Sequence, residues 1–218
     1  MLNTLWTAFG VGVIVTCRLI YMAAFKLSER HYPNWTHNKR RLFAVRVVSL
    51  GHATISLLSD FEFVKEPYGH ATDSSAYVFL FSLGYFVYDL VIRFASDCNH
   101  PRPCQLDMTL HGEAPQSKEY IVHHSLAISV FSLLLSTRVL FGFVLIGLLV
   151  EVQTVTLHSR AIFLLLGQHT SILFSALITT NLVFLLLFRH VPAFFLLYYL
   201  LLYAFVFESI DYDPLAST

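Results

Sequence analysis

Long apolar stretches recur along this chain, and they constrain the fold more than any other feature. A helix rises about 1.5 Å per residue, so about 20 apolar residues cross the roughly 30 Å of a bilayer's hydrocarbon core. Charged residues make up only 13% of the chain and hydrophobic ones 56%, so lipid must surround most of it. The sequence predicts an all-α, polytopic membrane protein of about seven transmembrane helices, although six remain an alternative. The expected spans are Leu5–Phe25, Leu42–Leu58, Ser75–Ala95, Tyr120–Ser136, Val139–Leu157, Ala161–Phe188 and Val191–Phe207.

The distribution of charge predicts the orientation of these spans. The first connection carries Lys26, Arg30, Lys39, Arg40 and Arg41, whereas the second is mostly acidic. Because Lys and Arg favour the cytosolic side, we expect the first connection in the cytosol. Lys plus Arg equals Asp plus Glu, 14 each, so the overall charge gives no reason to expect a nucleic-acid partner.

Ionisable side chains are predicted to gather at one depth, toward the cytosolic side of the membrane. Asp89 and Glu151 each precede the expected cytosolic end of a span by six residues, which corresponds to about 9 Å. His123, His124 and His169 follow the expected cytosolic starts of two other spans, at depths of roughly 5 to 12 Å. Three arginines are expected in the same layer: Arg18, Arg46 and Arg93. Because such groups are costly in hydrocarbon, they are candidate functional residues.

Polar residues also recur at helical spacing, which places them on single helix faces. On the second span the stripe is Arg46, Ser49, His52 and Ser56, and on the fifth it is Gly147, Glu151, Thr154 and His158. Stripes of this kind line a cavity or a helix contact. A bundle with an apolar far half and a titratable near half could hold an acyl chain deep and present its reactive head to the cytosol.

The paired histidines His123-His124 open a span, with Asp89 in the preceding span and Glu151 in the following one. This arrangement resembles the TLC-domain family, which includes the ceramide synthases. The segment 38–56, reading NKRRLFAVRVVSLGHATIS, is similar to the family's early span with a Ser and a His, and Leu157-His158-Ser159-Arg160 is similar to the exit from its later acidic helix. The resemblance covers about 34–207. It leaves 1–33 as a first helix with a basic connection and 208–218 as a short acidic tail.

The resemblance implies six spans around a lipid-accommodating cavity, with acyl-CoA arriving from the cytosol and the paired histidines near the chemistry. Ceramide synthases share a His-Asp-x-x-Asp cluster on the helix after those histidines. Here that stretch reads Leu149-Val150-Glu151-Val152-Gln153-Thr154, with a single carboxylate. The chain therefore looks more like the small, non-synthase TLC domain-containing proteins, which are associated with phospholipid composition. The endoplasmic reticulum is the membrane that the resemblance favours, with other endomembranes or the plasma membrane as alternatives.

These observations lead to a role in lipid metabolism or homeostasis, with acyl transfer from acyl-CoA to a lipid amine or hydroxyl as the leading activity. The catalytic candidates are His123 or His124 as nucleophile or general base, Glu151 as the orienting carboxylate and Asp89 as a second acid. The substrate-binding candidates are Arg46, Ser49, His52, Thr154, His158 and His169. No bound cofactor or metal is expected; membrane lipids and acyl-CoA are the expected partners, and a homo-oligomer is compatible with the sequence. The alternative is a non-enzymatic lipid-binding regulator or a transporter.

Each candidate also has a purely structural interpretation. Asp89 precedes Arg93 by four residues, the spacing of an intrahelical ion pair. The paired histidines could bond to backbone or headgroups at the membrane surface, and His52 and His169 could be hydrogen-bonded packing residues. A metal site is only weakly indicated, because a zinc site usually closes a tetrahedral set of ligands. In the loop at 96–119, three possible ligands follow one another at irregular spacing: Cys98, His100 and Cys104.

Overall fold

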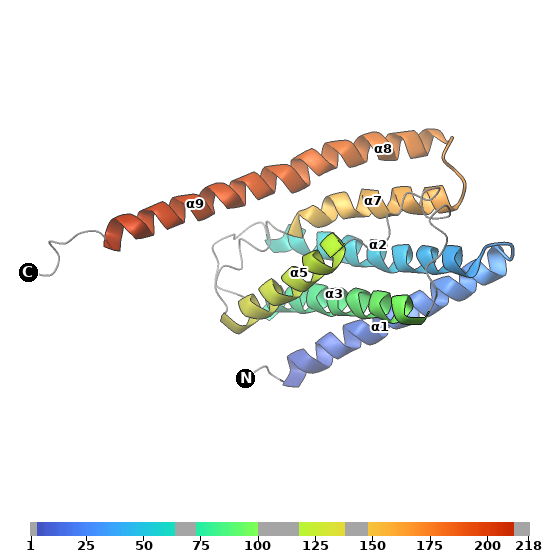
Figure 1. The fold of residues 1–218 in the computed structure, drawn as a ribbon, viewed down its shortest axis with the longest axis horizontal. Helices are drawn as coiled ribbons and strands as arrows, with labels where there is room; N and C mark the ends of the chain where they lie inside the picture. Colours follow the sequence, from blue (N-terminus) through green and yellow to red (C-terminus); the bar gives the residue numbers. More distant parts are fainter. Residues whose placement is uncertain (1–3, 64–72, 100–117, 138–147, 212–218) are drawn as a thin grey trace, which may run out of the picture.

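A computed structural model describes residues 4–63, 73–99, 118–137 and 148–211, and these residues form helices joined by short turns (Figure 1). The helices are α1 Thr4–His31, α2 His37–Phe63, α3 Asp73–Asn99, α5 Lys118–Thr137, α7 Val150–Leu165, α8 Ile172–Leu185, the π-helical segment η1 Leu186–His190 and α9 Val191–Asp211. The predicted all-α class is confirmed.

Within the described residues, three helical stretches are long and apolar enough to cross a membrane: Thr4–His31, His37–Leu58 and Ile172–Tyr199. Two shorter apolar stretches, Ala76–Ile92 and Ile121–Thr137, add to them. The chain is thus a multi-pass membrane protein. The three long stretches are long enough to cross the hydrocarbon core of a bilayer. Their helical form satisfies the backbone hydrogen bonds within each span, as lipid requires.

The helices pack so that α2 lies at the centre of the bundle. It packs against α7 on one side and against α1 on the other, while α3 packs against α1 and α5. Figure 1 shows α8 lying outside α7, with α9 continuing from α8 beyond the rest of the bundle. The apolar core is formed mainly by side chains of α1, α3 and α5 around Phe79, which is fully buried. The polar candidates lie on α2, α3, α5 and α7.

Gly84 on α3 allows the close approach of α1. A Cβ added there would lie 3.0 Å from the side chain of Val13 and 3.1 Å from the backbone oxygen of Gly10. We expect Gly84→Ala to force α1 away from α3 and to lower the free energy of unfolding by about 1–3 kcal/mol. Thermal unfolding of the purified protein in detergent measures this.

A matched control is available on α2. An alanine Cβ at Gly51 would meet nothing within 4 Å, and alanine is the better helix former. Gly51→Ala should therefore unfold at the same temperature as the native protein or slightly above it. Equal unfolding temperatures for the two alanine variants would show that the α1–α3 contact does not depend on Gly84.

The boundary between the predicted fifth and sixth spans was wrong. The prediction ended one helix at Leu157 and began the next at Ala161. In the structure α7 continues to Leu165, and the chain turns at Gly167, whose φ is 75°. Glycine adopts this left-handed conformation at little cost and commonly ends helices.

The predicted sixth and seventh spans are not separated by a turn. The expected reversal at Arg189 and His190 is replaced by the five π-helical residues of η1, so the helix runs on from α8 into α9. Pro192 follows directly after the start of α9 and contributes no backbone N–H. The His190 side chain donates from Nδ1 to the carbonyl oxygen of Leu185, 2.9 Å away, and so compensates for the altered backbone bonding around the π-helical segment.

Candidate functional site

The first histidine–carboxylate pair of the site joins α5 to α3. His124 Nε2 lies 3.2 Å from a carboxylate oxygen of Asp89. Both residues are buried, with exposed fractions of 6% and 3%. A carboxylate at this distance favours the tautomer that carries the proton on Nε2. A histidine oriented by a carboxylate is a candidate general base or nucleophile.

The two adjacent histidines have different surroundings. His124 points inward to Asp89, whereas His123 is exposed on the surface of α5. Their rings meet edge to face, with centroids 5.4 Å apart. This divergence follows from the helix, in which successive side chains point about 100° apart. The structure therefore separates the two candidates and places only His124 inside the cluster.

A second pair joins α2 to α7. His52 Nδ1 lies 3.9 Å from Glu151 Oε2, and both residues are buried, with exposed fractions of 3% and 8%. Glu151 was predicted to orient the paired histidines; in the structure Asp89 occupies that position and Glu151 lies beside His52. Glu151 precedes the end of α7 by 14 residues, or about 21 Å, so it lies deeper than the predicted 9 Å. The cause is the longer course of α7.

Aromatic side chains of α3 enclose His52. The ring of Tyr85 stacks on the imidazole with centroids 3.8 Å apart, and that of Phe81 is stacked at 5.4 Å. Phe86 meets His52 edge to face at 5.7 Å and meets His124 in the same way at 5.2 Å. One phenyl ring thus contacts both imidazoles, so the two histidine–carboxylate pairs are neighbours in a single cluster.

Hydroxyl groups surround the second ring nitrogen of His52 and the neighbouring tyrosine. Its Nε2 lies 3.3 Å from the hydroxyl oxygens of both Ser56 and Ser82. Tyr85 donates to Ser49 across 2.9 Å, and Ser49 in turn donates to a backbone oxygen of its own helix. The stripe on α2 was predicted to line a cavity or a helix contact, and in the structure Ser49, His52 and Ser56 form a helix contact lined with buried hydroxyls.

Ser82 and Tyr85 were not among the sequence candidates, although the sequence held a signal for them. Ser82, Tyr85 and Asp89 follow the same three- and four-residue steps that identified the stripes on α2 and α7. The many aromatic residues of α3 concealed this stripe. Tyr88 is buried beside it, with an exposed fraction of 5%.

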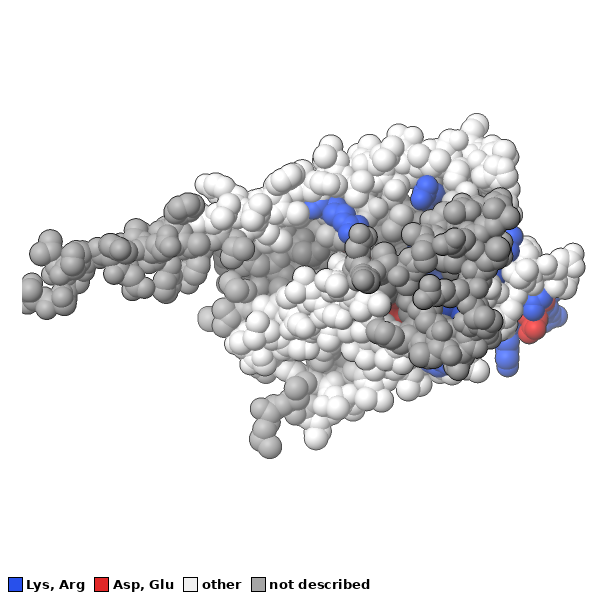
Figure 2. Space-filling model, in the orientation of Figure 1, with Lys and Arg blue, Asp and Glu red and all other residues white. Residues whose placement is uncertain are grey.

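The stripes on α2 and α7 also meet nearer the end of the bundle where α1 joins α2. Arg46 Nη1 lies 3.0 Å from His158 Nδ1, where the guanidinium donates and the imidazole nitrogen accepts. In Figure 2 Lys and Arg gather at this end of the molecule. Arg46 lies 9 residues, or about 13 Å, inside α2 from this end, so it lies on α2 between the basic end and His52.

One predicted binding residue lies outside the cluster. His169 was expected about 12 Å deep in a span, but it lies exposed in the turn between α7 and α8, because α7 continues beyond the predicted end of the helix. Thr154, by contrast, is half-buried beside Glu151, and its hydroxyl donates to the backbone oxygen of Val150 at 3.2 Å.

Some candidates lie outside the described residues. Gly147, His100 and Cys104 are among them, and the side chains of Arg93 and Cys98 are not described either. Among the residues that are described, no three His, Cys, Asp or Glu side chains form a group that could hold a metal ion.

Comparison with known proteins identifies the family of the chain. The family model of the TLC domain matches residues 41–215, which include α2 from its fifth residue onward and every residue of the two histidine–carboxylate pairs. TLC domain-containing protein 1 of Gallus gallus is 33% identical over 124 residues, which cover 56% of this chain and 43% of that protein. TLC domain-containing protein 2 of Danio rerio is 32% identical over 93 residues, covering 43% of this chain and 31% of that protein.

The aligned part of this chain thus spans less than half the length of either relative. No solved structure matches the chain. Helix α1 precedes the matched region, although it packs against α2 and α3. Because the match covers most of the sequence, the chain belongs to the TLC-domain family of membrane proteins, which is linked to lipid metabolism and homeostasis.

Proposed function

We propose that this protein binds a membrane lipid or acyl chain at the histidine–carboxylate cluster and transfers acyl groups from acyl-CoA to a lipid amine or hydroxyl. The observation that carries the proposal is the buried pair of His124 and Asp89, 3.2 Å apart. A histidine oriented by a carboxylate is the usual general base of acyl-transfer chemistry. The cluster lies within membrane-spanning helices, so its substrates are expected to be lipids.

In the proposed reaction, His124 Nδ1 removes the proton from the lipid amine or hydroxyl as that atom attacks the thioester carbonyl carbon. A C–N or C–O bond forms, the C–S bond breaks, and the proton passes from His124 to the departing thiolate. Asp89 stabilises the imidazolium that exists between these two proton transfers. Free CoA and the acylated lipid are the products, so atoms and charge balance.

The second pair is proposed to seat the acceptor headgroup. A single ammonium nitrogen or hydroxyl oxygen can lie about 2.8 Å from both His52 Nδ1 and Glu151 Oε2, because these two atoms are 3.9 Å apart. Glu151 Oε2 is buried and has no hydrogen-bond partner in the described structure, which leaves it able to accept such a bond. The basic end of the bundle, including Arg46, is proposed to attract the CoA phosphates.

The chemistry is tested with the purified full-length chain in phospholipid vesicles. Isotope-labelled acyl-CoA is added with a sphingoid base or a lysophospholipid as acceptor, and mass spectrometry follows the label. Labelled acyl-lipid together with free CoA supports acyl transfer. If no acceptor and no chain length gives a labelled lipid, the enzymatic part of the proposal is overturned.

A non-enzymatic lipid-binding regulator is the second candidate, because one carboxylate at Glu151 replaces the His-Asp-x-x-Asp cluster of the ceramide synthases. Cellular lipid profiles distinguish the two when deletion is compared with the triple substitution of His123, His124 and Glu151. A profile that changes on deletion but not in the triple variant would assign these three residues a structural role.

A further inference from the structure

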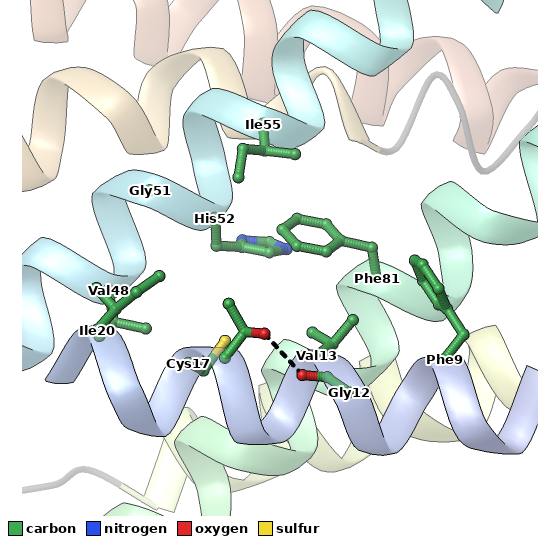
Figure 3. A pocket seen from close by; sticks show the side chains of 11 residues that line it. Phe9, Gly12, Val13, Cys17, Ile20, Val48, Gly51, His52, Ile55 and Phe81 are labelled. Atoms are coloured by element: carbon green, nitrogen blue, oxygen red, sulfur yellow. Dashed lines mark hydrogen bonds between the residues drawn. The ribbon is translucent and has the colours of Figure 1, made fainter. Parts of the chain in front are cut away.

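A cavity of about 370 Å³ lies between α1 and α2, with one wall supplied by α3. Its lining is apolar apart from Thr16 and His52, and the Thr16 hydroxyl donates to the backbone oxygen of Gly12 at 2.8 Å (Figure 3). The cavity therefore presents hydrocarbon and no unsatisfied donor along α1. We call it the α1–α2 groove and define it by its lining residues: Phe9, Gly12, Val13, Thr16, Cys17, Ile20, Val48, Gly51, His52, Ile55 and Phe81.

Two glycines create this space. A Cβ added at Gly12 or at Gly51 would meet nothing within 4 Å. Phe9, Ile20 and Ile55 at the edges of the groove are exposed, with exposed fractions of 37%, 39% and 48%. Since α1 and α2 are both candidate membrane spans, these edges face the bilayer, and the groove opens sideways into hydrocarbon rather than into water.

The depth and width of the groove indicate what occupies it. From Ile20 to Phe9 it extends about 16 Å along α1, from about 16 Å to about 33 Å from the end of that helix at His31. Spread over that length, its volume of about 370 Å³ makes the groove narrow and elongated. This shape suits a single file of methylene groups, whose carbon contacts are about 4 Å. A helix, about 10 Å wide, is too thick.

The groove also connects to the buried cluster. Figure 3 shows the rings of His52 and Phe81 side by side on its inner wall. The same imidazole has Glu151 Oε2 at 3.9 Å from its Nδ1 and two serine hydroxyls at 3.3 Å from its Nε2. A ligand in the groove would therefore touch the ring that holds the second histidine–carboxylate pair.

We propose that the α1–α2 groove seats one hydrocarbon tail of a membrane lipid, which enters from the bilayer between the two helices and packs against His52. The proposal deepens the proposed function, because it identifies where the tail of the bound lipid lies. It does not require acyl transfer. One wall of the site is α1, which lies before the region matched by the TLC domain.

The test uses the full-length protein in phosphatidylcholine vesicles that contain a phosphatidylcholine with a diazirine near the end of one acyl chain. After illumination, peptide mass spectrometry identifies the labelled residues. We expect labels concentrated in residues 9–20 of α1 and 48–55 of α2. Gly51→Leu fills the groove and should reduce this labelling about tenfold, the effect of overpacking by about 1–2 kcal/mol.

Matched controls separate a filled groove from a damaged fold. Gly10→Leu makes the same change on α1 outside the groove, where an added Cβ also meets nothing within 4 Å. Thr16→Phe fills the groove by a second route, and Val15→Phe places the same ring on an exposed position that does not line it. Both controls should keep native labelling, and Thr16→Phe should lose it as Gly51→Leu does.

The outcomes also distinguish this inference from the proposed function. Labels spread over lipid-facing residues in proportion to their exposure, and unchanged in Gly51→Leu and Thr16→Phe, would overturn the groove as a tail site. Groove labelling in a protein that transfers no acyl group would leave the tail site standing and remove the enzymatic proposal. Acyl transfer without groove labelling would overturn the tail site and leave the enzymatic proposal standing.

Discussion

Asp89→Asn is expected to reduce acyl transfer by about 10²- to 10⁴-fold, the usual contribution of general acid–base catalysis. The asparagine keeps the size of the side chain and a hydrogen bond to His124, but it no longer stabilises the imidazolium. It can also hold the wrong tautomer, because its amide NH₂ donates where the carboxylate accepts. His124→Gln should lower the rate by a similar factor. Initial rates with labelled acyl-CoA in vesicles measure both.

The double variant Asp89→Asn/His124→Gln provides the stricter test. Residues that act as one unit are not additive, so the double variant should be about as slow as the slower single variant. His123→Gln is the matched control, because His123 is exposed and points away from Asp89; it should retain nearly the native rate. Strictly additive losses, or a His123→Gln variant as slow as His124→Gln, would contradict the assignment.

His52→Phe is expected to lower the free energy of unfolding by about 3 kcal/mol. The phenyl ring can occupy the position between Tyr85 and Phe81, so the stacking is largely preserved. Stability is lost because the substitution removes the imidazole nitrogen beside Glu151, whose carboxyl group stays buried without that partner. Removing one member of a buried pair usually costs about 3–5 kcal/mol. Unfolding in detergent, followed by circular dichroism, measures the change.

Replacing both members should restore most of that stability. Buried pairs exchanged for apolar residues of similar size are often neutral, so His52→Phe/Glu151→Leu should unfold close to the native protein. Glu151→Gln alone should be milder than His52→Phe, because an amide is cheaper to bury than a carboxylate. If His52→Phe alone unfolds like the native protein, the pair contributes nothing to stability and its assignment as a coupled unit fails.

The sequence predicted the class of fold and most of the polar cluster, because both depend on local periodicity. Apolar length identified the spans, and three- and four-residue steps identified the faces bearing His52 and Glu151. The stripes of α2 and α7 meet at Arg46 and His158, although the sequence did not pair these two residues. Asp89 lies beside His124, a partner that the sequence did not assign to it.

Other features could not be derived from periodicity. Which carboxylate faces which imidazole depends on how four helices are rotated about their axes, and no local pattern encodes that rotation. The chain turns at Gly167 after α7 rather than after Leu157, and apolar length alone does not distinguish a helix-ending glycine from one within a span. The groove depends on side chains that are missing, at Gly12 and Gly51, and a glycine within an apolar helix gives no sign of which neighbour it faces.

Phe86 has a mechanical consequence for the whole cluster. Its ring is in contact with both imidazoles, and closely packed interiors transmit small displacements instead of absorbing them. Any shift of one histidine must therefore be accommodated by the other through this phenyl ring. A ligand that binds at one histidine–carboxylate pair would therefore displace the side chains of the other pair, even without a hydrogen bond between the two pairs.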